Sequence, residues 1–351
     1  PPAIEDDRDK SYQFSQYLPF APKVNWEPLE AVQVVDRGHF ADPSKHNLFS
    51  AAQRVKHLTP EIGTEILGID LRQLSGPQKD ELALLVAERG VVFFRHQEMN
   101  IYEQLDLARH LGPLHKHGIT PFPKEPGLEE VHVVYNDEAA QPSYYAMYPK
   151  WRMWHTDISY ELQPASTTCL RMLTCPEYGG DTLWSSAYAL YSSLSPGFQK
   201  YLEGLTALHS AVAQTEHTRA AGLHTRREPI ETVHPVVRVH PVTGFKGVYV
   251  NPAFTLRIIG VSKTESDTIL NFLFHEIGEN PDFQVRFHWE PNSVAIWDNR
   301  IVNHSAIFDF WPAVRHALRT TPHGEKPMSV EEYERETGKV AKDRKIELLK
   351  D

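Results

Sequence analysis

Hydrophobic residues along the chain follow two spacings, and the shorter one predominates. Phe283, Val285, Phe287 and Trp289 alternate with polar residues, which predicts a strand with one buried face. Residues 91–94 are continuously apolar, which is typical of a strand buried on both faces. The same reasoning predicts further short strands at 63–71, 131–135, 167–173, 235–240, 247–251, 293–297 and 315–321.

Helical spacing, with apolar residues three or four positions apart, marks a few longer segments. We expect helices over 76–88, 101–111, 196–205 and 262–277. Ser195 followed by Pro196 is a typical helix start, and Ser262 with Glu265 forms a capping-box pattern. Residues 136–150 and 213–232 are polar and without a clear period, so we predict a tyrosine-rich lid loop and a mobile excursion there.

Many short strands with a few helices predict a mainly β protein with covering helices. We expect one domain with a β-sandwich or jelly-roll core. Residues 1–53 read as an irregular N-terminal arm that packs its aromatic side chains against the body. The domain itself would cover 54–324, and residues 325–351 would form a charged, helical C-terminal tail.

Composition narrows the class of partner. The 351 residues carry a formal net charge of −10, which argues against a nucleic-acid partner because that function needs a basic surface. We find no apolar run long enough to cross a membrane. With two cysteines, Cys169 and Cys175, the fold does not depend on disulfides, which fits a reducing, cytoplasmic location.

The first candidate chemistry is the pair His155 and Asp157. On an extended strand these two side chains point to the same side and offer an imidazole and a carboxylate to one metal ion. His304, which follows the strand predicted at 293–297, is a candidate third ligand. Two histidines and one carboxylate form the facial triad of non-haem Fe(II) oxygenases, which leaves coordination positions open.

A second candidate is the arginine pair at 315 and 319, which shares one face of a predicted strand. A guanidinium fork matches the two oxygens of a carboxylate. Two such groups facing inward would bind two anions, or one dianion firmly. The alternative is an ordinary pair of surface arginines.

These residues together carry a resemblance. His155, Asp157, His304, Thr182 and Arg315 resemble the pattern of the taurine/2-oxoglutarate dioxygenase (TauD/TfdA-like) family, and the chain resembles a fungal-type sulfonate dioxygenase-like member of it. The resemblance implies a double-stranded β-helix, a cupin-like jelly roll. It also implies Fe(II), bound by His155, Asp157 and His304, with O2 and the co-substrate 2-oxoglutarate, which Arg315 and Thr182 would bind. The reaction would oxidise a C–H bond of a small anionic substrate and release succinate and CO2.

The resemblance further implies a substrate site. Arg319 and His117 fall where the taurine enzyme holds its sulfonate, and Ile158 and Phe254 would lie near the carbon chain. Trp151 and Thr120 stand where that enzyme has an asparagine and a tyrosine, so the amine end of the pocket differs. Another organosulfonate, or a carboxylate such as an amino acid or aryloxy acid, is therefore expected as substrate. The resemblance also implies a homo-dimer or homo-tetramer.

Two other functions use the same residues. A catalytically silent barrel could bind an anionic metabolite, but the intact set of metal ligands argues against it. A zinc hydrolase would leave Arg315 and Thr182 without a function, and catalytic zinc sites normally use a different ligand set.

Overall fold

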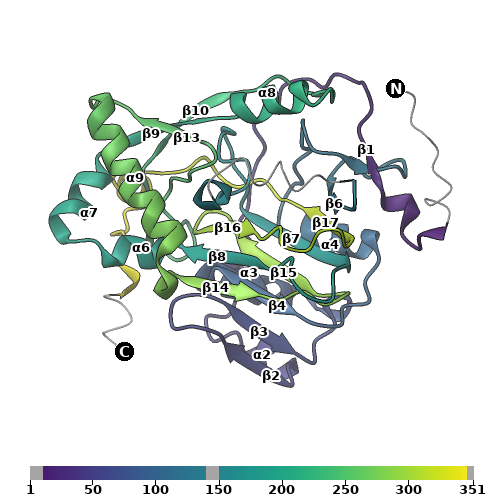
Figure 1. Ribbon diagram of the computed structural model, residues 1–351. Helices are drawn as coiled ribbons and strands as arrows, with labels where there is room; N and C mark the ends of the chain where they lie inside the picture. The colour runs from purple at the N-terminus through teal and green to yellow at the C-terminus, as the bar shows by residue number, and fades with distance from the viewer. Residues whose placement is uncertain (1–10, 140–149, 346–351) are drawn as a thin grey trace.

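Two β-sheets form the framework of the computed structural model, which describes residues 11–139 and 150–345 (Figure 1). The larger sheet has seven strands, and all neighbours in it are antiparallel except the parallel pair β3 and β4. Its strands, in spatial order, are β2 (Arg54–His57), β3 (Thr64–Leu67), β4 (Val91–Phe94), β15 (Val294–Asp298), β7 (Thr167–Thr174), β17 (Arg315–Thr320) and β6 (Val131–Asn136). The smaller, antiparallel sheet has the order β14 (Gln284–Phe287), β8 (Thr182–Ser186) and β16 (Val302–Ala306).

One apolar core lies between these two sheets. Phe93 of β4 stacks on Phe287 of β14 with ring centroids 4.1 Å apart, and Trp184 of β8 meets Trp297 of β15 edge to face at 5.7 Å. All four side chains are almost fully buried. The alternation predicted at 283–289 is confirmed for Val285, Phe287 and Trp289, which face this core. Phe283 lies just before β14 and packs in another apolar cluster, with residues of α9.

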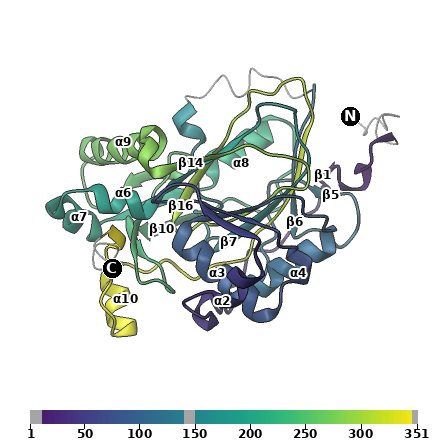
Figure 2. The same cartoon turned by 90° about the horizontal axis from the view of Figure 1, so that it is seen from below.

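Helices cover the outer face of the seven-stranded sheet (Figure 2). They are α2 (His46–Ala51), α3 (Gly76–Arg89) and α4 (Ile101–Leu111). Ser75 and Asn100 begin α3 and α4 with complete capping boxes, which satisfy amide groups at the helix starts. The predicted helices over 76–88 and 101–111 are confirmed.

Smaller elements surround the other end of the molecule, where α9 lies across α6 and the smaller sheet (Figure 1). A three-stranded sheet has the order β10 (Glu231–Pro235), β9 (Thr206–Ser210) and β13 (Thr255–Ile258), and β11 (Val237–Val239) pairs with β12 (Lys246–Val248). The remaining elements are α6 (Ala187–Ser193), α7 (Pro196–Glu203), α8 (Val212–Ala220), α9 (Lys263–Glu279), α10 (Val330–Thr337), and the paired strands β1 (Pro19–Phe20) and β5 (Phe122–Pro123).

The mobile excursion predicted at 213–232 is wrong, because this segment contains α8 and the start of β10. The polar sequence conceals the helix because its fully buried inner residue is Thr215, whose hydroxyl donates to the Ala211 carbonyl at 3.0 Å. Arg219 extends the polar contacts beyond the helix, since it pairs with Glu228 and donates from Nε to the Thr225 hydroxyl at 3.1 Å. Residues 140–149 of the predicted lid loop lie outside the described residues.

Several aromatic side chains of the N-terminal segment pack against the body, but the segment is not irregular throughout, because it contains α2. Trp26 stacks on Phe122 with centroids 6.0 Å apart. Tyr12 places its hydroxyl 2.9 Å from Nδ1 of the buried His316. The arm is therefore part of the packed structure from Tyr12 onward.

His316 should make the stability of the protein depend on pH. Burial lowers the pKa of His316 to about 4, from 6.5, so the unfolded chain binds more protons between these pH values. Stability is therefore fully present above pH 6.5 and is lost as the pH falls, by about 2 kcal/mol at pH 5 for this one group. Urea unfolding at pH 7 and pH 5 should show a smaller loss in His316→Gln than in the wild type. Equal losses would contradict this assignment.

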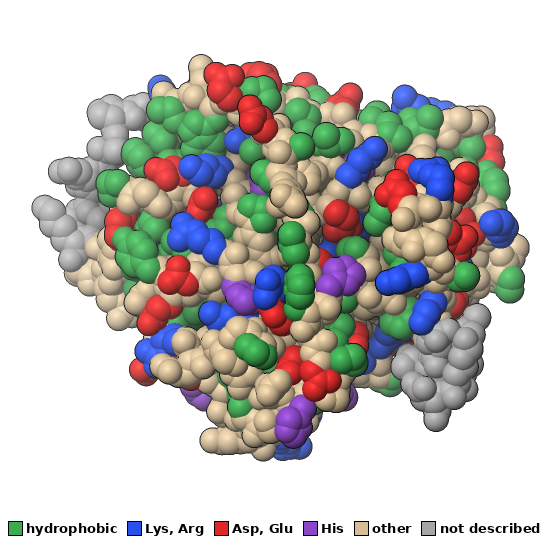
Figure 3. Space-filling view, turned by 180° about the vertical axis from the view of Figure 1, so that it is seen from behind, with side chains coloured by type: hydrophobic (Ala, Val, Ile, Leu, Met, Phe, Trp, Pro, Cys, Tyr) green, Lys and Arg blue, Asp and Glu red, His purple; other side chains and the backbone are tan. Residues whose placement is uncertain are grey.

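The described surface carries mixed charge. Figure 3 shows acidic and basic side chains interspersed over the described part of one face, without a continuous basic patch there. Within 11–139 and 150–345, no helix has the length and apolar character needed to cross a membrane.

Candidate metal centre and anion pocket

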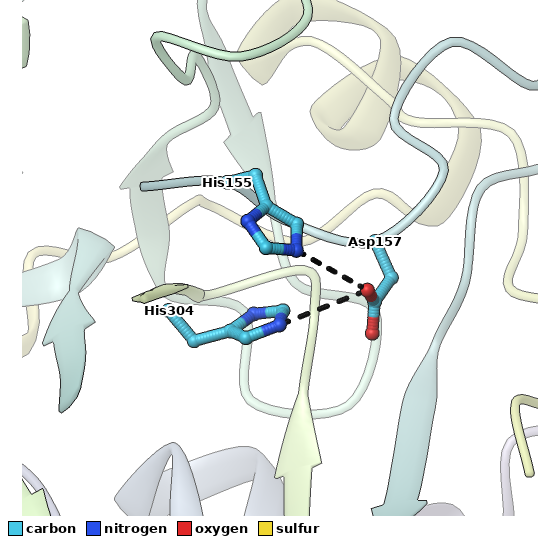
Figure 4. A group of neighbouring side chains, drawn as sticks. All are labelled: His155, Asp157 and His304. Atoms are coloured by element: carbon cyan, nitrogen blue, oxygen red, sulfur yellow. Dashed lines mark ion pairs between the residues drawn. The ribbon is translucent and has the colours of Figure 1, made fainter. Parts of the chain in front are cut away.

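His155, Asp157 and His304 converge in space. One potential ligand atom from each lies within 4.8 Å of the other two. Nε2 of either histidine is 3.7 Å from Oδ1 of Asp157, and Figure 4 shows both rings directed at that oxygen. Two histidine nitrogens and one carboxylate oxygen that lie this close together are the donor set of a facial triad.

The strand predicted through His155 and Asp157 is wrong. His155 forms a single bridge with His304 of β16, in which each main-chain N–H donates to the other's carbonyl at 3.0 and 2.7 Å. The chain then enters a turn, and Ile158 has a φ of +46°. The bridge and the turn, rather than strand alternation, bring the imidazole and the carboxylate together.

Hydrogen bonds orient two of these groups for metal binding. Nδ1 of His155 lies 2.9 Å from the Met153 carbonyl, which can only accept, so Nδ1 carries the proton. The lone pair of Nε2 is then free for a cation between His155 and Asp157. Oδ2 of Asp157 accepts from the Thr168 hydroxyl at 2.8 Å, which leaves Oδ1 facing the histidines. Asn299 accepts the Asp157 main-chain N–H at 3.2 Å and donates to Thr168 at 2.8 Å.

Charge at the site suits a cation. Burial alone raises the pKa of Asp157, but Arg319, His304 and His155 outweigh it and bring that pKa well below its usual value. Burial lowers the pKa of both His155 and His304. At neutral pH the site therefore offers one carboxylate and two neutral imidazoles, the protonation states that metal binding requires.

Beside Asp157 lies a small cavity, which we call the anion pocket. Arg319 of β17 donates from Nη1 to Oδ1 of Asp157 at 2.7 Å, and its Nη2 lies 2.5 Å from Nδ1 of His132. Four residues predicted for the substrate site meet here, namely His117, Thr120, Ile158 and Arg319. The cavity is lined by His115, His117, Thr120, Phe122, Glu129, Glu130, Val131, His132, Asp157, Ile158, Arg319 and Thr321.

Two other predicted substrate residues lie in different places. The Phe254 ring meets His155 edge to face with centroids 6.0 Å apart, so it borders the candidate metal centre. Trp151 stacks on Phe274 of α9 at 6.2 Å and packs in the core beside that helix. The structure thus brings Phe254, but not Trp151, into contact with a triad residue.

Arg315 and Thr182, the two residues predicted to bind 2-oxoglutarate, form a second polar group, which we call the dicarboxylate site after that prediction. Nη2 of Arg315 lies 3.5 Å from the Thr182 hydroxyl, which also accepts from the Trp289 indole at 3.0 Å. Arg315 is 2% exposed, which excludes the interpretation of a surface arginine pair. In the ladder of β8 and β16, His304 is opposite Trp184 and Ala306 is opposite Thr182. Thr182 therefore lies two residues along β8 from Trp184, the residue opposite the triad histidine His304, and on the same face of the strand.

The sequence analysis missed three residues that contact the candidate metal centre or the anion pocket. Thr168 and Asn299 hold Asp157, and His132 contacts Arg319. Asn299 directly follows β15 and lies five residues before His304, and this position beside a predicted ligand was the signal that could have identified it. Thr168 and His132 lie on strands predicted for their apolar residues, where a single polar side chain is inconspicuous.

Comparisons with known proteins agree on one family. Residues 54–321 match the profile of the family described as "Taurine catabolism dioxygenase TauD, TfdA family". The chain is 40% identical over 342 residues to the "Alpha-ketoglutarate-dependent sulfonate dioxygenase" of Saccharomyces cerevisiae, covering 92% of this chain and 80% of the relative. It is 43% identical over 333 residues to the "Alpha-ketoglutarate-dependent dioxygenase cnsP" of Penicillium expansum, covering 90% and 87%. A crystal structure of a taurine dioxygenase from Burkholderia xenovorans superposes with a TM-score of 0.67 at 32% identity, covering 80% of this chain and 93% of that one.

Proposed function

We propose that this chain, which belongs to the TauD, TfdA family and is therefore an Fe(II)- and 2-oxoglutarate-dependent dioxygenase, oxidises a small organosulfonate. The observation that carries the proposal is the anion pocket beside Asp157, where Arg319 supplies a buried positive charge with His117 and His132 as neighbours. The names of the yeast and Burkholderia relatives, which refer to sulfonates and taurine, support the same substrate class.

The metal ligands in this proposal are His155, Asp157 and His304. Two imidazoles and one carboxylate suit Fe(II) and leave positions open for other ligands. When bound, Fe(II) supplies the activation of O2, coupled to conversion of 2-oxoglutarate to succinate and CO2. Thr168 and Asn299 hold the Asp157 carboxylate in orientation, and the Met153 carbonyl fixes the tautomer of His155.

The co-substrate and the substrate would be held by separate arginines. Arg315 and Thr182 would bind the far carboxylate of 2-oxoglutarate, because a buried guanidinium and a hydroxyl match its two oxygens. Arg319 and His117 would bind the sulfonate, with Ile158 and Phe254 along the carbon chain and Thr120 at the rim. The ring of Trp151 packs on α9, and its role as a substrate residue stays a prediction.

The finer architecture is also part of this proposal. The two sheets that share the core of Phe93 and Trp184 would be the two halves of a double-stranded β-helix. We keep an arm at 1–53, one catalytic domain at 54–324 and a tail at 325–351. We also infer a small anionic partner, a cytoplasmic location and a homo-dimer or homo-tetramer.

Succinate release with a panel of substrates tests the proposal. Alkanesulfonates should stimulate succinate release from 2-oxoglutarate, and matched carboxylates should do so much less. Arg319→Ala should reduce this stimulation by about 100-fold, because the sulfonate loses a buried charged partner, while substrate-independent 2-oxoglutarate turnover stays measurable. Stimulation by amino acids or aryloxy acids instead of sulfonates would favour a carboxylate substrate. Equal loss of both turnovers in Arg319→Ala would contradict its role in substrate binding.

A further inference from the structure

The turn that carries Asp157 contains a strained residue. Ile158 follows Asp157, is 3% exposed and has a φ of +46°. A β-branched side chain is rarely found in this left-handed region. Such a conformation persists where the surrounding structure holds it in place. The residues that hold this turn therefore help to decide where the Asp157 carboxylate lies.

Ser159 is the anchor on the far side of Ile158. Its side chain is fully buried, and its hydroxyl accepts from Nδ2 of Asn251 at 2.9 Å. The same hydroxyl lies 3.0 Å from Nδ1 of His209 on β9. Because the Ser159 oxygen already accepts from the amide, its own proton is available for His209. The turn is thus fastened to two buried polar groups from other parts of the chain.

Asn251 connects this anchor with the histidine side of the metal centre. Its Oδ1 accepts the Phe254 main-chain N–H at 2.8 Å, while its Nδ2 donates to Ser159. The Phe254 ring in turn meets the His155 ring edge to face. One buried amide therefore links the turn that bears Asp157 to the side chain that packs against His155.

We propose that Ser159 and Asn251 are positioning residues that set the metal affinity of this enzyme. Their hydrogen bond keeps the turn at Ile158 in its strained form, so that Oδ1 of Asp157 stays directed at His155 and His304. Without it the turn relaxes and the three ligands are no longer pre-organised. This inference rests on the proposed metal role of His155, Asp157 and His304.

Metal titration of the folded apo-protein tests the inference without measuring activity. Co(II) or Fe(II) should bind Ser159→Ala about tenfold more weakly than the wild type, in the range found when residues that orient metal ligands are removed. Tyr188→Phe is the matched control, because it also removes a buried hydroxyl, here 2.9 Å from Thr243. Its metal affinity should equal that of the wild type even if its stability falls.

A rescue variant separates positioning from a purely structural role. Glycine adopts positive φ without strain, so Ile158→Gly added to Ser159→Ala should return the metal affinity to within about threefold of the wild type. If Ser159→Ala does not fold, Asn251→Ala removes the donor to Ser159 together with the acceptor for Phe254 and should weaken metal binding by at least about tenfold.

The outcomes distinguish two failures. Wild-type affinity in Ser159→Ala or Asn251→Ala, or no recovery on adding Ile158→Gly, overturns the positioning role and leaves the metal centre intact. A wild-type protein that does not bind one Co(II) or Fe(II) per chain overturns the metal centre itself, and the positioning role with it.

Discussion

Replacing His304 with alanine should abolish Fe(II) binding and, with it, succinate formation. The His304 ring faces Oδ1 of Asp157, and its main chain forms the bridge to His155. Removing residues that merely orient a ligand costs about 10- to 100-fold in metal affinity, so losing a ligand should cost more than about 100-fold. Anaerobic Fe(II) with 2-oxoglutarate should give a weak visible charge-transfer band in the wild type and none in His304→Ala.

A matched control separates this effect from general damage to the fold. His316→Gln also replaces a fully buried histidine in a strand, but that residue contacts the N-terminal arm and lies outside the triad. It should retain the charge-transfer band and the wild-type affinity for Fe(II). A band of normal intensity in folded His304→Ala would show that the metal is bound elsewhere.

The core and its helices could be predicted because their patterns are local. The alternation at 283–289, the apolar run at 91–94 and the spacing at 101–111 each identify an element from a few neighbouring residues. Helix α8 could not be found in this way, because its buried position is occupied by Thr215, whose hydroxyl bonds the Ala211 carbonyl. A pattern of apolar residues cannot reveal an element that lacks one.

In the candidate site, the residues could be predicted from the sequence, but their conformation could not. His155, Asp157 and His304 could be selected from the sequence because the ligand types and the resemblance identify them. Their arrangement could not, because it depends on the bridge between His155 and His304 and on the positive φ of Ile158. A β-branched residue gives no sequence signal for a left-handed turn, so a strand was the natural and incorrect prediction.

The dicarboxylate site combines a buried positive charge with a hydroxyl. Arg315 is held by the Gly180 carbonyl, to which its Nε donates at 3.1 Å, and it lies beside Thr182. Gly180 itself has a φ of +68°, so the turn before β8 requires a residue that tolerates this conformation. The arginine is therefore fixed before a ligand arrives, which reduces the entropy lost on binding.

Arg315→Ala should raise the KM for 2-oxoglutarate by about 100-fold or more, since removing one partner of a buried ion pair typically costs about 3–5 kcal/mol. Arg315→Lys should have an intermediate KM, because it keeps the charge but loses the two-pronged geometry. Arg171→Ala removes another buried arginine, from the neighbouring strand β7, and should leave the KM unchanged. Steady-state succinate formation at varied 2-oxoglutarate measures all three. If Arg315→Ala saturates like the wild type, the far carboxylate binds another residue, and the dicarboxylate site would have to be reassigned.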